Sequence, residues 1–362
     1  MKITVYAISK NEEKFAARWV KSMAEADHIC VLDTGSADGT VEILADLGVI
    51  VRREEIVSWR FDVARNRSME LIPEDTDICV CTDLDEVFRP GWRAALERAW
   101  RPGTEQLRYS YIWSFDEHGR PGTEFLQEKI HAPGVFRWVH PVHEVLERTD
   151  GAVSWPVAEA PEIVLEHHPD HGKSRGGYLR LLELSVRERP NDDRNAHYLG
   201  REYMFHRRWD EAIAQLQRHL TLPTATWAAE RSASMRFISR CYLAKGDQPE
   251  AMRWALRAVA EAPELRESWV QAEEAAYAGE DWPAAAFFGG KAVAVTKKSG
   301  CYINEERAWG AYPWDAMAYA LYRLGDLEGA AAATERALEL EPGNERLRGN
   351  MKFYRGDRGG KG

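Results

Sequence analysis

The sequence predicts two domains, an α/β domain with a mostly parallel sheet followed by an all-α domain of helical repeats. Strand-like and helix-like segments alternate through the first half, which is the pattern of a parallel α/β sheet. A run of small and apolar residues at 78–82 fits a buried strand of such a sheet. After residue 174 the apolar residues recur at helical spacing instead. We therefore expect domains at 1–175 and 176–350, with a disordered tail at 351–362.

The composition narrows the range of partners. A chain of 362 residues is long enough for two domains, and 44% hydrophobic with 29% charged residues is ordinary for a globular protein. The formal net charge of −10 argues against nucleic acid or an anionic membrane as a partner, since both need clustered Lys and Arg. No stretch approaches the roughly 18 apolar residues of a membrane span, and none resembles a signal peptide. The five cysteines are odd in number and lack metal-ligand spacing, which predicts a reducing, cytoplasmic location.

The β-rich segments of the first domain give the expected strands in chain order. Amphipathic helices follow the early strands. The first places Phe15, Trp19 and Met23 on one face, and the helix expected at 59–69 carries Arg65. The expected strands are residues 2–9, 28–32, 49–52, 78–82, 107–112 and 162–169. Because strands alternate with helices, most of them should run parallel.

Three carboxylates follow the strand at 78–82, namely Asp83, Asp85 and Glu86. Ligands of open α/β sheets bind beyond the carboxyl ends of the strands. Carboxylates gathered there repel one another, so a positive partner is expected. Mg²⁺ is typically held by one or two carboxylates together with substrate phosphates. The alternative is a solvated turn or an N-cap before the helix that begins near Pro90.

Other polar residues follow strands or lie on the helices between them. The glycine-bearing turn at 33–40 can present backbone N–H groups to an anion, and Arg65 can reach a phosphate. The alternatives are a plain strand–helix connection and an exposed helix charge. Glu144, beside aromatic and apolar residues, can have its pKa raised by desolvation and act as a base, whereas a strand edge with ordinary polar residues is the alternative. His167 and His168 are candidate metal ligands or simply structural residues.

Five short motifs, taken in chain order, resemble the family 2 glycosyltransferases of the Rossmann-like GT-A fold. The resemblance is closest to the branch that includes lipopolysaccharide-core transferases and bacteriocin peptide S-glycosyltransferases, and it covers roughly residues 1–175. The motifs are NEE at 11–13, DTGSADGT at 33–40, ARN at 64–66, DLDE at 83–86 and W-x-x-x-V-H-E at 138–144. Many members carry two consecutive aspartates where this chain has Asp33 and Thr34.

The resemblance implies an inverting sugar transfer from a nucleotide-sugar, usually a UDP-sugar, with Mn²⁺ or Mg²⁺. The residues that it assigns to the nucleotide and its phosphates are Ser9, Asp33, Arg65, Asp83 and Asp85. Among these, Asp83 would lie near the ribose and metal, and Asp85 would ligate the metal. His167 or His168 would complete the metal shell.

The resemblance also implies that Glu144 is the catalytic base. Three other carboxylates compete for this role, namely Glu86, Asp116 and Glu117. A base opposite the leaving group would remove the acceptor's proton during a single in-line displacement, which inverts the anomeric centre. A metal held by carboxylates would stabilise the charge on the departing diphosphate.

The second half fits the tetratricopeptide pattern L-G-x-x-Y followed by Ala, first seen at Leu199, Gly200 and Tyr203. The register recurs and predicts four helical hairpins between about 193 and 345, whose alanine and aromatic positions form the core. Solenoids present concave surfaces, so we expect these repeats to bind a protein or peptide acceptor or to form a homodimer. The aromatic segment at 297–313 interrupts the repeats, and we expect it to serve the donor or acceptor site or to dock the two domains.

The motifs together predict a cytoplasmic hexosyltransferase with a peptide or protein acceptor. Two alternatives stay open: transfer to a lipid-linked or cell-surface glycan, and a non-catalytic repeat scaffold with an inactive first domain. A nucleobase-modifying transferase would need a basic groove, which the acidic composition does not favour.

Overall fold

The computed structural model describes residues 1–115, 119–170, 172 and 176–356. The chain divides into two compact units, Met1–Ser185 and Val186–Gly362. The division falls within helix α5 (Tyr178–Glu188), after the expected boundary at residue 175. The ring of Tyr178 lies against Phe61 and His143, so the start of this helix packs on the first unit.

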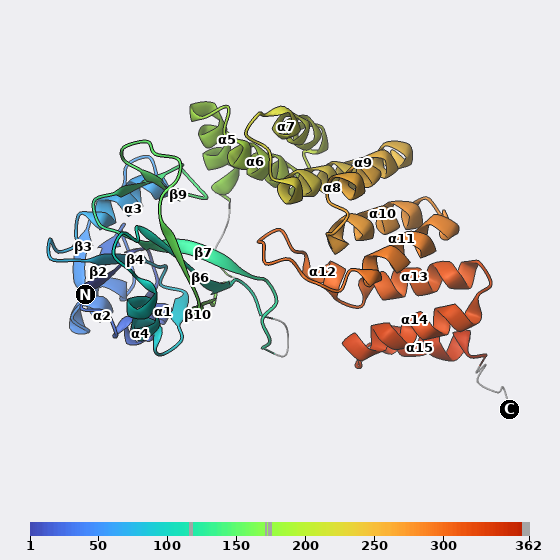
Figure 1. Cartoon of the computed structure of the whole chain (residues 1–362), viewed down its shortest axis with the longest axis horizontal. Helices are drawn as coiled ribbons and strands as arrows, with labels where there is room; N and C mark the ends of the chain where they lie inside the picture. The colour runs from blue at the N-terminus through green and yellow to red at the C-terminus, as the bar shows by residue number, and fades with distance from the viewer. Residues whose placement is uncertain (116–118, 171, 173–175, 357–362) are drawn as a thin grey trace. The chain divides into compact units, whose positions relative to one another are not determined.

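The first unit contains an eight-stranded sheet in the order β3-β2-β1-β4-β7-β6-β10-β5 (Figure 1). The first four strands run parallel, with Ser9 in register with Asp33 and Tyr6 in register with Cys81. Their bounds are β1 Ile3–Ser9, β2 His28–Asp33, β3 Ile50–Arg53 and β4 Ile78–Cys81. The carboxyl ends of β1, β2 and β4 therefore meet at one edge, as the predicted α/β fold requires.

The other half of the sheet is mixed. Strand β7 runs antiparallel to both β4 and β6, and β5 runs antiparallel to β10, while β6 and β10 are parallel. A separate hairpin joins β8 to β9. Their bounds are β5 Glu86–Phe88, β6 Gln106–Ile112, β7 Glu124–His131, β8 Phe136–Val139, β9 Val145–Arg148 and β10 Val157–His167. Strands β5, β7, β8 and β9 were not among the six expected strands, because they are short or lack a run of apolar residues.

Helices cover both faces of the sheet, and side chains alternate between them. Ile3 and Val5 pack with Trp19 on the face covered by α1 (Glu13–Met23), α2 (Thr40–Asp46) and α4 (Trp92–Ala99). Tyr6 points to the opposite face, where α3 (Phe61–Met69) and the β8–β9 hairpin pack. Three cysteines on β2 and β4 are buried and free, as expected for small apolar residues.

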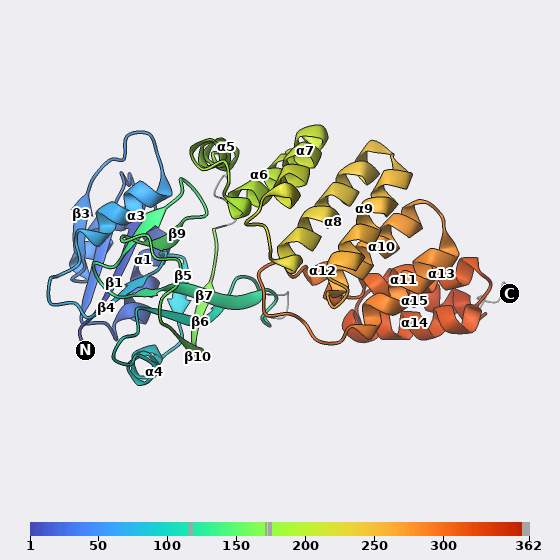
Figure 2. The same cartoon turned by 45° about the horizontal axis from the view of Figure 1, so that its top comes forward.

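The second unit is a series of antiparallel helix pairs (Figure 2). The pairs are α6 Asp193–Phe205 with α7 Trp209–Thr221, α8 Ala228–Lys245 with α9 Gln248–Glu261, α10 Arg266–Ala278 with α11 Trp282–Ala294, and α13 Tyr312–Arg323 with α14 Leu327–Leu340. A Cβ at Gly200 would lie 2.5 Å from Leu216 Cγ, so the glycine of the repeat motif lets α6 and α7 approach closely. The four predicted hairpins and their alanine-rich core are confirmed.

Helix α15 and the segment at 297–313 lie outside the four helix pairs of this unit. Helix α15 (Glu345–Tyr354) buries Met351 and Tyr354, so the first part of the tail expected to be disordered from residue 351 is helical instead. Residues 357–362 lie outside the described chain. The segment at 297–313 contains α12 (Glu306–Trp309) and packs within its own unit, since Glu305 pairs with Arg240 of α8.

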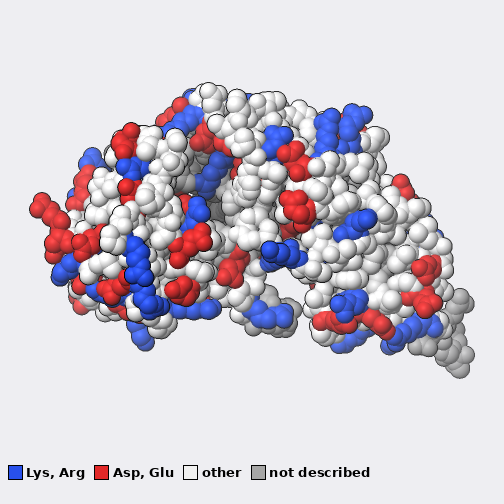
Figure 3. All heavy atoms as spheres, viewed as in Figure 1, with Lys and Arg blue, Asp and Glu red and all other residues white. Residues whose placement is uncertain are grey.

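Two features bear on the predicted partners. Acidic and basic side chains are interspersed over the face seen in Figure 3. Among the described residues, no helix is both long enough and apolar enough to cross a bilayer.

Candidate functional site

The carboxyl ends of β1 and β2 are joined by a hydrogen-bond network centred on Asp33. This residue is 0% exposed. Its Oδ1 accepts from the backbone N–H groups of Gly35 (3.1 Å) and Ser36 (2.9 Å), and its Oδ2 accepts from the hydroxyls of Ser9 (2.9 Å) and Ser36. Gly35 has φ 107°, which a side chain would strain. Ser9 and Asp33, both predicted to contact the nucleotide, thus lie together and shape this turn.

The NEE and DTGSADGT motifs also bind each other. The backbone N–H of Asn11 donates to Ser36 Oγ (2.8 Å), and the Asn11 Oδ1 accepts from the N–H of Ala37 (2.8 Å). One step further, Glu13 Oε2 accepts from the N–H of Gly39 (2.6 Å). The loops after β1 and β2 are therefore held together at one edge of the sheet by hydrogen bonds of their own.

Two cations engage Asp83, the first carboxylate after β4. The Arg65 guanidinium donates to Asp83 Oδ1 (2.9 Å) and Oδ2 (3.1 Å), and the Lys129 ammonium donates to Oδ2 (3.1 Å). Burial alone would raise the pKa of Asp83, but the charges of Arg65 and Lys129 outweigh it and hold the pKa well below its usual range. The sequence predicts a positive partner for the carboxylates after β4. Asp83 has two such partners within the protein, Arg65 and Lys129.

Arg65 connects this carboxylate to Glu144. It lies on α3, is only 3% exposed, and donates from Nε to Glu144 Oε1 (2.5 Å). Arg65 is therefore not an exposed helix charge. Its guanidinium donates both to Glu144, the predicted base, and to Asp83, which is predicted to lie near the ribose.

The turn that carries Glu144 is strained and anchored. His140 and His143 both have positive φ, 81° and 53°, which non-glycine residues seldom adopt. The carbonyl of Pro141 accepts from the backbone N–H of Phe61 at the start of α3 (2.9 Å). Such strain persists only where the surrounding structure enforces it, and it clusters at functional sites.

Buried hydrogen bonds that join α3, β8, β1 and β7 support the turn that carries Glu144. The Asn66 side chain bonds both the N–H and the carbonyl of Trp138 (2.9 and 2.8 Å), which fastens α3 to β8. Trp138 Nε1 donates to the Tyr6 hydroxyl (2.8 Å), which lies 2.8 Å from His131 Nε2. Burial lowers the pKa of His131 to about 4, so its neutral ring can accept from Tyr6. The ARN motif and the W-x-x-x-V-H-E motif therefore contact each other directly.

The other carboxylates considered for the role of base are Glu86, Asp116 and Glu117. Glu86 is 1% exposed, and its Oε1 accepts from the Tyr111 hydroxyl (2.8 Å) and the Lys129 ammonium (3.3 Å). Its Oε2 accepts from the backbone N–H of Asp83 (2.8 Å), so both oxygens of this buried carboxylate already have donors. Asp116 and Glu117 lie outside the described residues.

The two histidines at the end of β10 point in different directions. His167 Nε2 lies 3.4 Å from Asp85 Oδ2, and its Nδ1 lies 3.1 Å from the Trp113 carbonyl. His168 Nε2 is instead 3.2 Å from Glu166 Oε2. Burial would lower the pKa of His167, but the hydrogen bond to Asp85 and its charge outweigh this and raise it. Of the two predicted metal ligands, only His167 faces Asp85.

A divalent cation fits this pair by donor chemistry. One carboxylate and one imidazole nitrogen are ligands that Mn²⁺ accepts, and the Trp113 carbonyl orients the ring as outer partners of metal-bound histidines do. Asp83 is different, because both of its oxygens already accept from Arg65. Asp85 and His167 would therefore hold the ion, and donor oxygens would complete its shell.

Sequence reasoning missed two residues of this cluster. Lys129 and Tyr111 lie on β7 and β6 and reach the carboxylates from the antiparallel half of the sheet. Lys129 is a lone basic residue in the strand EFLQEKIH. No local pattern identifies Lys129, because nothing in the sequence predicts that β7 pairs with β4.

The second unit has a tyrosine-lined groove of its own, with a volume of about 330 Å³. The Tyr277 and Tyr319 rings are 5.5 Å apart, and the Arg307 guanidinium lies 3.7 Å from the Tyr312 ring. Arg346 pairs with Asp315 on its wall (2.7 Å). Tyrosine supplies large contact area with a hydrogen-bonding hydroxyl, which suits a peptide.

In comparison with known proteins, two family models match two separate segments of the chain. Residues 4–128 match the family model described as Glycosyl transferase family 2, and residues 271–356 match the model described as Prolyl 4-hydroxylase peptide-substrate-binding domain. Prolyl 4-hydroxylase subunit alpha-1 of Gallus gallus is 46% identical over 43 residues, which are 12% of this chain and 8% of the relative. The chain thus matches less than a tenth of that relative's length. The predicted resemblance is confirmed for residues 4–128, a range that excludes the motif at 138–144.

Several solved structures align with part of the chain. They are described as "Crystal structure of MamA" (16% identity, TM-score 0.38, 46% of this chain and 88% of that chain) and "Crystal structure of APC/C hetero-tetramer Cut9-Hcn1" (15%, 0.41, 51% and 33%). A third is TTC0263, described as a thermophilic TPR protein in Thermus thermophilus (19%, 0.36, 49% and 89%).

Proposed function

We propose that this chain, which contains a family 2 glycosyltransferase domain at residues 4–128, transfers a sugar from a UDP-sugar to a peptide or protein acceptor with inversion. One observation carries the proposal. Arg65 holds Asp83 and Glu144 together, and Asp85 faces His167, among residues gathered around the end of β4. Carboxylates, a guanidinium and an imidazole in this arrangement suit a diphosphate leaving group and a base.

Glu144 is the base in this proposal. Arg65 fixes its Oε1, and Oε2 would take the proton from the nucleophilic atom of the acceptor. As that atom forms its bond to the anomeric carbon, the bond from this carbon to the phosphate oxygen breaks, and the electron pair leaves with the nucleoside diphosphate. A single displacement of this kind inverts the anomeric centre.

The other residues serve the donor. A bound Mn²⁺ or Mg²⁺ supplies positive charge that stabilises the departing diphosphate. Asp85 and His167 would hold that ion. Asp83, kept ionised by Arg65 and Lys129, would accept one hydrogen bond from the ribose, because three of its roughly four lone-pair sites already have donors. Ser9 and Asp33 would set the shape of the nucleoside pocket, because their mutual hydrogen bond fixes the first turn.

The tyrosine-lined groove supports a peptide as the acceptor. It lies within residues 271–356, which match a domain described as peptide-substrate-binding. Tyr277, Tyr312 and Tyr319 offer rings and hydroxyls to an extended backbone. A lipid-linked glycan would not need this groove. Transfer to a peptide that depends on the groove would therefore favour a peptide acceptor over a glycan acceptor.

Transfer from a panel of UDP-sugars, with and without Mn²⁺, tests the enzyme. Asp85→Ala and His167→Ala should each lower kcat by about 10²-fold or more, since they remove charge stabilisation in the transition state. His168→Ala is the matched control and should change kcat less than about threefold. Full activity in Asp85→Ala, or equal losses in the two histidine variants, would contradict the metal assignment.

The acceptor assignment needs a separate measurement. Tyr319→Ala should raise KM for a peptide acceptor while hydrolysis of the UDP-sugar by water stays unchanged, because the groove contacts the acceptor alone. Glu328→Ala, which truncates an exposed residue on α14 that does not line the groove, is the control. An unchanged KM in Tyr319→Ala would exclude the groove and leave the donor site untouched.

A further inference from the structure

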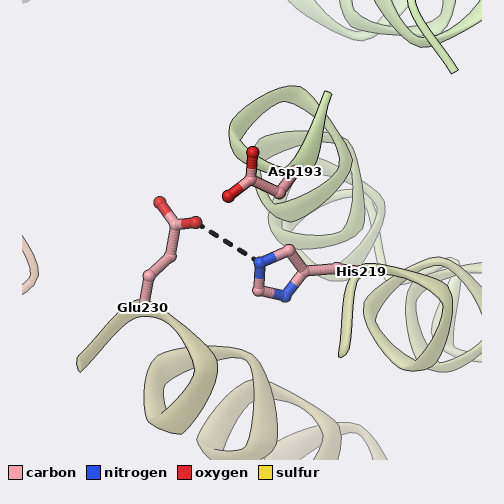
Figure 4. A group of neighbouring side chains, drawn as sticks. All are labelled: Asp193, His219 and Glu230. Atoms are coloured by element: carbon pink, nitrogen blue, oxygen red, sulfur yellow. Dashed lines mark ion pairs between the residues drawn. The ribbon is translucent and has the colours of Figure 1, made fainter. Parts of the chain in front are cut away.

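Three side chains from three helices of the second unit converge away from the tyrosine-lined groove. Asp193 is the first residue of α6, His219 lies in the last turn of α7, and Glu230 lies in the first turn of α8. Their ligating atoms all lie within 4.8 Å of one another. Figure 4 shows a carboxylate oxygen of Asp193 directed toward the space between His219 and Glu230.

His219 carries the strongest indication of a missing partner. The residue is 0% exposed, and within the described chain its Nε2 makes no hydrogen bond, although it lies 3.3 Å from Glu230 Oε1. A buried ring nitrogen without a hydrogen bond costs free energy and needs an explanation. The atoms that it faces are carboxylate oxygens, which attract a cation.

An outer layer of hydrogen bonds orients these groups. Ser234 Oγ lies 2.9 Å from His219 Nδ1, and the Tyr302 hydroxyl donates to Glu230 Oε2 (2.5 Å). When Nδ1–H donates to Ser234, the lone pair of Nε2 faces the carboxylates. Outer partners of this kind fix the tautomer and direction of metal-bound histidines and carboxylates.

An ion pair between His219 and Glu230 is the alternative explanation, but it leaves Asp193 unaccounted for. Among the described residues Asp193 forms no ion pair, and an acidic residue is favoured in the first turn of any helix. That preference does not direct its carboxylate toward His219. Arg194 interacts with the charge of Glu230 but not, among the described residues, with Asp193 as an ion pair.

We propose that Asp193, His219 and Glu230 form a structural site for a divalent metal ion, with Zn²⁺ as its preferred occupant. Three protein ligands and one water complete a tetrahedral shell, and an imidazole nitrogen favours Zn²⁺ over Mg²⁺. The ion ties α6, α7 and α8 together. Through Tyr302 it also fixes the aromatic segment at 297–313 against α8.

Zn²⁺ binding to the full chain tests this site. The Asp85→Ala background removes the proposed catalytic ion, so the two sites are measured separately. After EDTA treatment, calorimetric titration should give one saturable Zn²⁺ per chain, and Zn²⁺ should raise the thermal midpoint. Adding Asp193→Asn should weaken binding by about tenfold or more, as loss of one ligand implies. Asp193 is partly exposed, so the midpoint without metal should stay unchanged.

Asp46→Asn is the matched control, because it removes the same charge from an exposed position on α2. It should leave the Zn²⁺ affinity unchanged. Co²⁺ should give visible absorption bands of a tetrahedral site in the parent that are lost with Asp193→Asn. Equal Zn²⁺ binding by Asp193→Asn and Asp46→Asn, or no saturable binding in the parent, would overturn the proposal and leave a buried ion pair.

Discussion

Two buried glutamates, one in each unit, are treated differently by the fold. Glu86 in the first unit accepts hydrogen bonds from Tyr111, from Lys129 and from the backbone N–H of Asp83. Glu273 in the second unit is 0% exposed, and within the described chain neither of its carboxyl oxygens has a hydrogen-bond partner. The same side chain thus accepts three hydrogen bonds in one place and, among the described residues, none in the other.

The two glutamates differ in the groups that act on their pKa. Burial raises the pKa of both residues. At Glu86 the ammonium of Lys129 acts against burial, while the charges of Asp83 and Asp85 add to the rise. Around Glu273 the other charges are those of Glu274 and Asp315, which raise its pKa, and of Arg307, which lowers it. The end of β4 therefore places cations beside its carboxylates and holds the pKa of Asp83 below its usual range, whereas at Glu273 burial raises the pKa with Arg307 opposing it.

The largest effect should come from removing the cation of the first region. Lys129→Met would leave Glu86 buried without its ammonium and Asp83 with Arg65 alone. Breaking a buried ion pair in this way typically costs about 3–5 kcal/mol. Urea unfolding of the full chain should show that loss in the first unit. Lys21→Met, at an exposed position on α1, is the control and should change stability by less than about 0.5 kcal/mol. Equal stability of the two variants would mean that the donors around Glu86 are redundant.

The next effect concerns the space around Glu273. Gly289 makes that space, because an added Cβ would overlap Glu273 Oε1 and lie 2.9 Å from Met317 Cβ. Gly289→Ala should therefore destabilise the second unit by about 1–3 kcal/mol, as overpacking does. At Gly290 the Cβ would meet only the Met317 sulfur at 3.9 Å. Gly290→Ala should be neutral or stabilise the helix by up to about 1 kcal/mol. A stabilised Gly289→Ala would show that α10 and α11 are less closely packed.

A smaller effect should follow from trimming one donor of the first region. Tyr111→Phe removes the hydroxyl that donates to Glu86 but leaves the other two donors. The expected cost is about 0.5–1.5 kcal/mol, the usual contribution of one hydrogen bond. Chemical denaturation measures it. Tyr242→Phe on α8, whose hydroxyl makes no hydrogen bond among the described residues, serves as the control with less than about 0.5 kcal/mol. A cost near that of Lys129→Met would place the ion pair and the hydroxyl in one cooperative network.

The sequence predicts the framework of both regions but not the contacts that distinguish them. Alternating apolar strands and the L-G-x-x-Y pattern predict the sheet and the helix pairs, since hydrophobic periodicity is local. The motifs also predict Asp33, Asp83, Asp85, Arg65 and Glu144 as a group. They do not predict that the Asp33 carboxylate is fully buried and accepts hydrogen bonds from Ser9, Gly35 and Ser36.

The remaining contacts depend on long-range pairing. Lys129 reaches Asp83 only because β7 inserts antiparallel beside β4, and no local pattern specifies that insertion. The choice between His167 and His168 follows from the pairing of β10 with β5, which sets their opposite directions. Glu273 appears in sequence as one of several acidic residues on a helix. Its burial follows from Gly289 on the next helix.

The last and smallest effect is a pH dependence that should belong to the second region alone. Because the pKa of Glu273 is raised by burial, the folded state keeps a proton that the unfolded chain releases above the ordinary glutamate pKa. The folded state then binds more protons than the unfolded state, so stability falls as pH rises above that value. Glu273→Gln removes this dependence.

Urea unfolding at two pH values measures the difference. Glu273→Gln should exceed the parent in unfolding free energy at about pH 8 and match it near pH 4, where both states of the parent are protonated. The gain should be smaller than the changes above, because glutamine leaves the same two polar atoms buried. Glu264→Gln, at an exposed position, should track the parent at both values. A difference that is the same at both pH values would mean that shape, and not the proton, distinguishes Glu273 from glutamine.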